Sequence, residues 1–314
     1  MRPVFRTPPP LGTRRTTTQR TKYGDDSYTI AASALAVRLG EYCSYCEAPV
    51  QGALQVEHMM AKLGGNNSAA NEWCNFLLAC NQCNAKKNKN PDSEERLSNY
   101  IWPSVVARLP TVGNPAEWSF SFDMFSYDLR LPLAGEVLEL TQLNPAVAHV
   151  FVSPNVARDA TMQDRAERTI ALTGLNACAP LTRPGDRRFI ERTAAWSAAD
   201  ALATAYLPIL TNAATPAADL QALEAEISGA ALAFGFWSVW MTVFRGRLAV
   251  LPVCDAKLRS LFITQFPGTF YFSAAERTAL AAPVLEVKLP PTYFGAYSSG
   301  ARVRQTPYDF PIVP

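Results

Sequence analysis

The sequence lacks an apolar run long enough to cross a lipid bilayer. Its most apolar stretch, residues 230–244, is shorter than the roughly 20 residues that a membrane-spanning helix needs, and it contains Ser238 and Thr242. Residues 1–22 contain no apolar segment of the kind found in secretion signals. We therefore expect residues 230–244 to form a buried helix, and we expect a cytoplasmic protein without membrane contacts.

The sequence also lacks a strong net charge and has few histidines. Its 29 basic and 27 acidic residues leave a formal charge of +2, which by itself selects no class of partner. Only two histidines occur, His58 and His149. The segment 1–22 is basic and contains no acidic residue, and its proline and threonine content predicts an extended arm. The arm is either a disordered or surface-draped terminus or a contact for DNA or a protein partner.

Cysteine is sparse and odd in number, which argues against a secreted disulfide framework. Of the seven cysteines, four form two Cys-x-x-Cys pairs, Cys43/Cys46 and Cys80/Cys83. Four thiolates at this spacing predict a tetrahedral zinc site, and because they fill its coordination sphere the zinc would be structural. Metal binding in a reducing cytosol fits this pattern better than disulfide bonds. Cys74 lies outside both pairs, and we expect it to contribute only to packing.

Hydrophobic periodicity predicts an α+β protein with three regions. Residues 1–25 form the arm, residues 26–105 a zinc-stapled unit of two strands and a helix, and residues 106–314 a mostly helical region that begins with a β-hairpin. Thr215 is expected to cap a helix whose first residue is Pro216. The pattern predicts helices at 27–39, 160–173, 187–212, 216–234, 235–245 and 255–266, strands at 54–58, 73–79 and 118–124, and a hairpin in which 129–133 and 137–140 flank a turn at 134–135.

A Glu57-His58 dipeptide lies between the two cysteine pairs, and Asn84 directly follows the second pair. A neutral imidazole can take a proton from water near neutral pH, whereas carboxylate and amide oxygens suit Mg²⁺ or Mn²⁺. The combination predicts phosphodiester hydrolysis with one divalent cation held by Glu57 and Asn84 and with His58 as the base. Neighbouring residues on a strand point to opposite faces. Glu57 and His58 can therefore share a site only if the strand ends or bulges there, or if metal and water lie on either side of its edge.

Two clusters of basic side chains each have two interpretations. The lysines beside the site, Lys86, Lys87 and Lys89, either contact nucleic-acid phosphates or form a solvated helix start. The arginines of a predicted helix, Arg187, Arg188 and Arg192, either form another phosphate patch or, as we favour, a charged helix face. His149 has apolar neighbours, and we expect it to be a buried or edge histidine.

The stretch from Cys43 to Asn90 resembles the HNH, or ββα-metal, endonuclease family. The resemblance is carried by CSYC, VEHMMAKLGG, the Asn75 of WCNFLLAC, and CNQCNAKKN. It implies that His58 is the general base, that Glu57 replaces the usual Asp as a metal ligand, and that Asn84 is the last ligand. It also implies that Asn75 pins the loop and orients the histidine. The spacing along the chain from His58 to Asn75 and on to Asn84 is the one that the family shows.

Two departures from the family pattern occur. Glu57 is one methylene longer than the usual Asp, and the lysine after the second knuckle is followed by Lys87 where the family usually has Gly. Asn88 is therefore a weaker candidate than Asn84 for the last metal ligand.

Other segments resemble a group of bacterial HNH proteins with a helical C-terminal half. These segments are MRPVFR, YIWPS, TIALTGLN and FWSVWMTVF. Some members of that group serve in anti-phage defence, as in the nuclease subunit of Septu-type systems, which works with an ATPase. The resemblance implies a DNA endonuclease in defence, with an ATPase or another defence-system subunit as partner; RNA is the less favoured substrate. The alternative is a non-catalytic zinc-knuckle subunit that binds nucleic acid or assembles with another protein.

Overall fold

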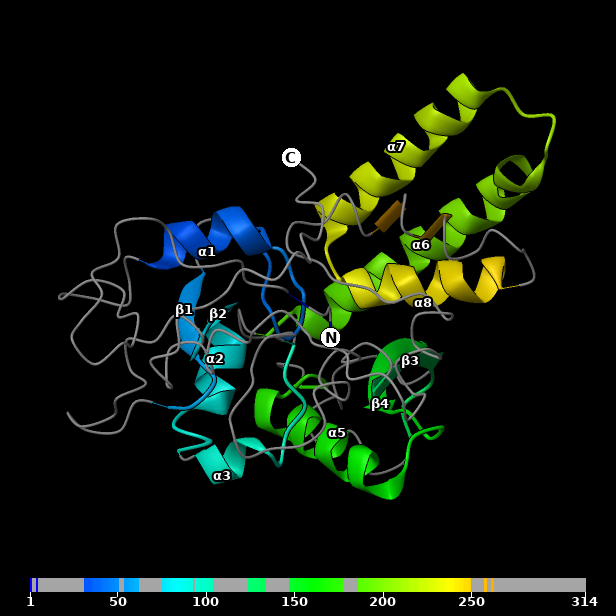
Figure 1. The fold of residues 1–314 in the computed structure, drawn as a ribbon. Helices are drawn as coiled ribbons and strands as arrows, with labels where there is room; N and C mark the ends of the chain where they lie inside the picture. Colours follow the sequence, from blue (N-terminus) through cyan, green and yellow to red (C-terminus); the bar gives the residue numbers. More distant parts are fainter. Residues whose placement is uncertain are drawn as a thin grey trace, which may run out of the picture.

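The structure is a computed structural model that describes residues 1, 4, 31–50, 54–61, 75–92, 94–103, 124–133, 147–177, 186–249, 257–258 and 261–262. Several predicted features lie outside this part of the chain: most of the basic arm, Cys74, residues 118–123 of the strand predicted at 118–124, the turn at 134–135 and the strand at 137–140. Within it the fold is α+β, as predicted: a small unit of strands and helices, a β-hairpin, and then a helical region (Figure 1).

The first unit is built on a short antiparallel strand pair. Strands β1 (Gln55–His58) and β2 (Phe76–Ala79) lie within the ranges that the sequence predicted, and helix α2 (Asn81–Lys87) follows β2 almost directly. Helix α1 (Ala31–Leu39) packs against both strands through a stripe of buried apolar side chains. The short helix α3 (Glu94–Leu97) completes the unit. This arrangement sets the end of β1 beside α2, where the site lies.

A second antiparallel pair joins β3 (Phe125–Arg130) to β4 (His149–Pro154). In this ladder Phe125 lies opposite Pro154 and Arg130 opposite His149. The second strand that the sequence predicted, at 137–140, lies outside the described residues, and the sequence did not predict β4. The reason is that the partner of a strand is set by contacts across the sheet and by helix packing, and α5 (Ala160–Thr173) packs against β4.

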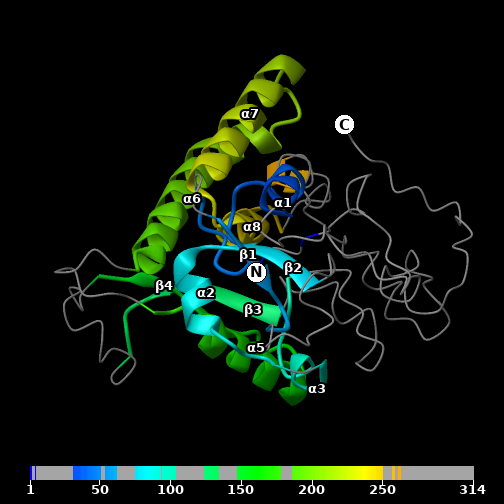
Figure 2. The same ribbon diagram turned by 90° about the vertical axis from the view of Figure 1, so that its left-hand side faces the viewer.

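The described residues from 186 to 249 consist mainly of three helices. Helices α6 (Arg188–Thr211) and α7 (Ala217–Phe234) form an antiparallel pair, and α8 (Trp237–Leu248) packs on α6 (Figures 1 and 2). Pro216, not Thr215, is the residue that precedes α7, and no side chain caps the helix there. Among the described residues, no helix combines the length and the apolar character that crossing a membrane requires.

Two clusters of buried apolar side chains form the core. One extends from the strands of the first unit to β3, β4 and α5, and it also includes Met1 and Val4 from the arm. The other lies among α6, α7 and α8. Helix α6 belongs to both clusters, because Ala195 lies in the first and Ala199 in the second. The first unit and the helical region are therefore packed together along one helix.

Candidate functional site

The four paired cysteines form one buried cluster. Their sulfur atoms all lie within 4.8 Å of one another, and the sulfurs of Cys46 and Cys80 are 3.8 Å apart. A tetrahedral zinc ion with bonds of about 2.3 Å would separate its sulfur ligands by about 3.8 Å. Cys80 also caps α2, because its sulfur accepts a hydrogen bond from the backbone N–H of Cys83 at 3.4 Å. The donor set and its spacing fit a structural zinc ion.

Burial alone would not favour thiolates at this cluster. It raises the pKa of the Cys46 and Cys83 thiols, since a charged sulfur loses its hydration there. An all-thiolate cluster therefore requires a cation to compensate its charge. Zinc would supply that positive charge, and its binding would release the thiol protons.

Glu57 and His58 are the last two residues of β1. Both side chains are buried, with 4% and 5% of their surface exposed. The ladder with β2 runs without a bulge from Gln55 to His58, and the strand ends at His58. The imidazole of His58 meets the edge of the Phe76 ring, with centroids 5.1 Å apart. Of the alternatives that the sequence left open, the structure therefore shows a strand that ends at the dipeptide.

Lys87 pairs with Glu57 inside the protein. Its Nζ lies 2.7 Å from Oε1 of Glu57 and donates a hydrogen bond of 2.7 Å to the backbone oxygen of His58. Burial raises the pKa of the Glu57 carboxyl and lowers that of the Lys87 ammonium, and in each case the charge of the partner opposes the shift. The prediction that Lys87 contacts phosphates is contradicted here, because only 1% of its surface is exposed. Lys86 and Lys89 are exposed, so that prediction stays open for them.

Asn75 fastens the turn that follows His58. Its Oδ1 accepts a hydrogen bond from the backbone N–H of Met60 at 2.8 Å, and its Nδ2 donates one of 2.9 Å to the backbone oxygen of Met60. Its own backbone oxygen accepts a further bond from the N–H of Met59 at 2.9 Å. Three hydrogen bonds from one buried residue thus hold the two residues that leave the strand after His58.

Asn84 faces β1 from helix α2. Its Nδ2 donates a hydrogen bond of 2.5 Å to Oε1 of Gln55. Gln55 and Glu57 are two residues apart and share a face of the strand, whereas Asn84 and Lys87 are three apart and share a face of the helix. The structure therefore brings Glu57 and Asn84 to the same seam between β1 and α2, each with a different partner across it.

The residue after Lys87, rather than Lys87 itself, has an unusual backbone conformation. Lys87 is the last residue of α2, and Asn88 after it has φ 52° and ψ −129°. This is a conformation that glycine adopts most readily. The position that calls for glycine is therefore Asn88, and Lys87 is an ordinary helical residue. The spacing of three residues between Asn84 and Lys87 was the signal that could have placed Lys87 on the inner face.

Arg188 and Arg192 also differ from the prediction of a charged, solvated helix face. They are 3% and 1% exposed, and both donate hydrogen bonds to backbone carbonyls of other segments. Arg188 also donates to the sulfur of Cys83 at 2.7 Å. Only Arg187 lies on the exposed face, near Glu191. Sequence reasoning missed Arg188 because it lies 105 residues from Cys83 along the chain.

Two strands, a helix and a four-cysteine cluster that fits zinc make residues 43–90 a ββα unit. A family model described as HNH endonuclease matches the same residues. No curated protein and no solved structure was found to be significantly similar to the chain. Residues 43–90 therefore form an HNH endonuclease domain, which belongs to a family of metal-dependent nucleases that hydrolyse phosphodiester bonds in nucleic acids.

Proposed function

We propose that the protein cleaves DNA, with its catalytic groups at the seam between β1 and α2. The observation that carries this proposal is the position of Glu57 and His58 at the end of a strand whose following turn is held by Asn75. In this proposal the carboxylate of Glu57 and the imidazole of His58, neighbours at the end of β1, serve one site. Asn84 lies across the seam, where its amide nitrogen donates to Gln55, and its amide oxygen is proposed as the second protein ligand.

In this proposal each residue has one role. His58 takes a proton from the attacking water, so that a P–O bond to the water oxygen forms while the bond to the leaving oxygen breaks. Asn75 keeps the imidazole in place through the backbone of Met59 and Met60. Lys87 holds the end of β1 against α2 through the backbone oxygen of His58. Lys86 and Lys89 are exposed near the site and are proposed to contact DNA phosphates.

Glu57 and Asn84 are proposed to hold the divalent cation, Mg²⁺ or Mn²⁺. Carboxylate and amide oxygens are suitable ligands for such ions, and they leave most positions to water and phosphate. A bound cation would supply charge stabilisation for the phosphate and the leaving oxygen. The Lys87 ammonium lies 2.7 Å from Oε1 of Glu57, so it would compete with a cation at that oxygen.

The test is cleavage of supercoiled plasmid DNA in Mg²⁺ or Mn²⁺ by the wild type, His58→Ala and His149→Gln. Loss of the general base should slow cleavage by about 10²–10⁴-fold. His149→Gln changes the only other histidine, which lies in the hairpin, and should leave the rate close to wild type. Zinc content and circular dichroism of each variant show whether it is folded. A matched RNA substrate is included and should be cut more slowly.

Two outcomes would contradict this proposal in different ways. If folded His58→Ala cut as fast as the wild type, His58 would not be the base. If the folded, zinc-loaded wild type cut nothing in any metal while still binding DNA, the non-catalytic zinc-knuckle subunit would be the better interpretation.

We further propose a role in anti-phage defence beside an ATPase or another defence subunit. Only the sequence resemblance of the segments at 1–6, 100–104, 169–176 and 236–244 supports this proposal. Plaque counts on cells that carry the gene with its neighbours, compared with the His58→Ala form, would test it. Equal plaque numbers in both strains over a broad phage panel would count against it.

A further inference from the structure

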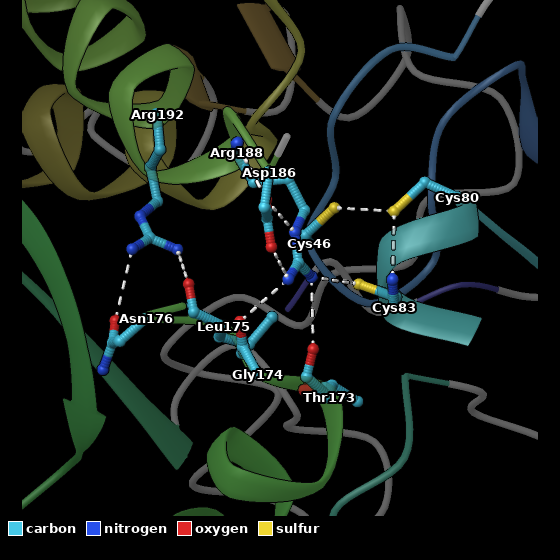
Figure 3. A network of polar contacts seen from close by, with 10 residues as sticks. All are labelled: Cys46, Cys80, Cys83, Thr173, Gly174, Leu175, Asn176, Asp186, Arg188 and Arg192. Atoms are coloured by element: carbon cyan, nitrogen blue, oxygen red, sulfur yellow. Dashed lines mark hydrogen bonds and ion pairs between the residues drawn. The ribbon is translucent and has the colours of Figure 1, made fainter. Parts of the chain in front are cut away.

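The zinc cluster lies against the first turn of α6. Arg188 reaches out of that helix to the sulfur of Cys83 at 2.7 Å (Figure 3). The same guanidinium donates to the backbone oxygens of Thr173 at 3.1 Å and Gly174 at 3.0 Å, which end α5. Its Nε donates to Asp186 at 2.7 Å, and a second contact with that carboxylate completes the set. One buried side chain thus joins the cysteine cluster to two elements of the helical region.

The contact between Arg188 and Cys83 would offset part of the negative charge of a zinc-bound cluster. A zinc ion with four thiolates carries two more negative than positive charges, and such an excess is unfavourable away from water. A hydrogen bond from a charged donor to a ligand sulfur offsets part of it and orients the ligand. Arginine suits this role, because its planar fork can serve one sulfur and several oxygens together and it keeps its charge when buried. A lysine at this position could not reach the same set.

The other cysteine pair makes a matching contact. Glu47 follows Cys46, and its carboxylate accepts hydrogen bonds from the backbone N–H of Ser238 at 2.7 Å and from the Ser238 hydroxyl at 2.6 Å. Its backbone oxygen also accepts one from the N–H of Phe236 at 2.9 Å. The carboxylate therefore lies at the N-terminus of α8, where backbone N–H groups of a helix lack internal partners. Each knuckle thus contacts a different helix of the C-terminal region.

We propose that the zinc cluster positions the helical region on the nuclease domain, and that Arg188 is the positioning residue that stabilises the Cys83 thiolate. Zinc then orders the starts of α6 and α8 as well as the nuclease domain. This inference rests on the cysteine cluster and the contacts around it, and it does not depend on the catalytic roles proposed above. A failure of either proposal would leave the other standing.

The first test uses the full-length, zinc-loaded protein with Arg188→Met, Arg188→Lys and the control Arg187→Met. Arg187 is the neighbouring arginine, its side chain is 71% exposed, and its Nε lies 3.8 Å from Oε1 of Glu191. The rate of zinc transfer to a chelator should rise about 10- to 100-fold in Arg188→Met, which is the usual effect of removing a hydrogen-bond partner from a metal ligand. It should rise less in Arg188→Lys and stay unchanged in Arg187→Met.

Cobalt substitution separates a contact with sulfur from a purely structural role. The sulfur-to-cobalt charge-transfer band should shift in Arg188→Met and not in Arg187→Met. Equal bands and equal zinc-transfer rates in these two variants would overturn the role of Arg188.

A second measurement needs no variant and applies even if Arg188→Met does not fold. Hydrogen exchange of the wild type is compared before and after zinc removal. Protection should be lost at the starts of α6 and α8, around residues 188–192 and 237–240, more than at the distal ends of α6 and α7. Unchanged protection at both helix starts would overturn the proposal that zinc positions the helical region.

Discussion

At the scale of single residues, the site is built from buried polar groups that are paired. Glu57 with Lys87 and Glu47 with Ser238 are both enclosed in the protein. A buried charge without a partner costs several kcal/mol, so Lys87 stabilises Glu57, and Ser238 and the N-terminal ammonium of Met1, at 3.5 Å, stabilise Glu47.

Replacing Asn75 by Ala should weaken both the fold and catalysis. The variant loses the two side-chain hydrogen bonds to Met60 and leaves the backbone groups of that residue unpaired. We expect the free energy of unfolding to fall by about 1–3 kcal/mol. Cleavage should slow more than the stability loss explains, because the turn after His58 is no longer held. Chemical denaturation and plasmid cleavage measure both effects, with the exposed Asn99→Ala as control; a folded variant with normal cleavage would contradict the role of Asn75.

His149 should make stability depend on pH. It is 7% exposed, packs on the Phe189 ring, and its ring nitrogens have no hydrogen-bond partner among the described residues. Burial lowers its pKa below the usual value of about 6.5. The unfolded chain therefore binds the proton more strongly. The contribution of His149 to stability is present above about pH 6.5 and is lost as the pH falls from there through the folded-state pKa.

The measurement is urea denaturation across this pH range for the wild type and His149→Leu. The wild type should lose more stability on acidification than the variant. Acid also weakens the cysteine cluster, but that effect is common to both proteins and cancels in the difference. Parallel pH profiles would show that His149 does not titrate on unfolding.

At the scale of elements, the junction between α7 and α8 shows why local patterns misplace boundaries. The apolar pattern predicted a helix from residue 235, whereas α8 begins at Trp237. Gly235 and Phe236 have positive φ values of 68° and 53°, so neither continues a helix. The turn lets the N–H of Phe236 reach the backbone oxygen of Glu47, which belongs to a distant part of the chain. The boundary is thus set by docking onto the cysteine knuckle.

A pair of glycine substitutions tests this junction. A Cβ on Gly235 would lie 2.6 Å from Cδ of Pro49 and 2.7 Å from the backbone oxygen of Glu47, and its φ is unfavourable for alanine. We expect Gly235→Ala to lower the free energy of unfolding by about 2 kcal/mol or more. Gly229 lies inside α7 with nothing within 4 Å of its added Cβ, so Gly229→Ala should raise stability by about 0.5–1 kcal/mol. Thermal and urea unfolding of both variants check the opposite signs; equal shifts would contradict the close contact at Gly235.

At the scale of the whole molecule, the family domain and the helical region share their packing. The core that contains β1 and β2 continues into β3, β4 and α5, beyond the division proposed from the sequence at residues 105 and 106. Helix α6 joins this core to the second one, and Trp196 packs against both. A nuclease domain of this size buries little core by itself, so the helices and the cysteine cluster together supply its support. The boundary between residues 105 and 106 therefore stays a prediction from the sequence.

The sequence by itself determined the cysteine cluster, the Glu57-His58 dipeptide and most of the long helices. These features are local: ligands three residues apart and apolar side chains every three or four residues follow from the chain geometry alone. Only the tertiary structure decided that β4 pairs with β3, that Lys87 faces inward to Glu57, and that Arg188 binds the sulfur of Cys83. These contacts join residues that lie between 19 and 105 positions apart (149 − 130 for the nearest ladder pair), and no local pattern encodes them. They form because an unpaired buried charge or an unpaired strand edge is unfavourable, and tertiary packing determines which distant residue supplies the partner.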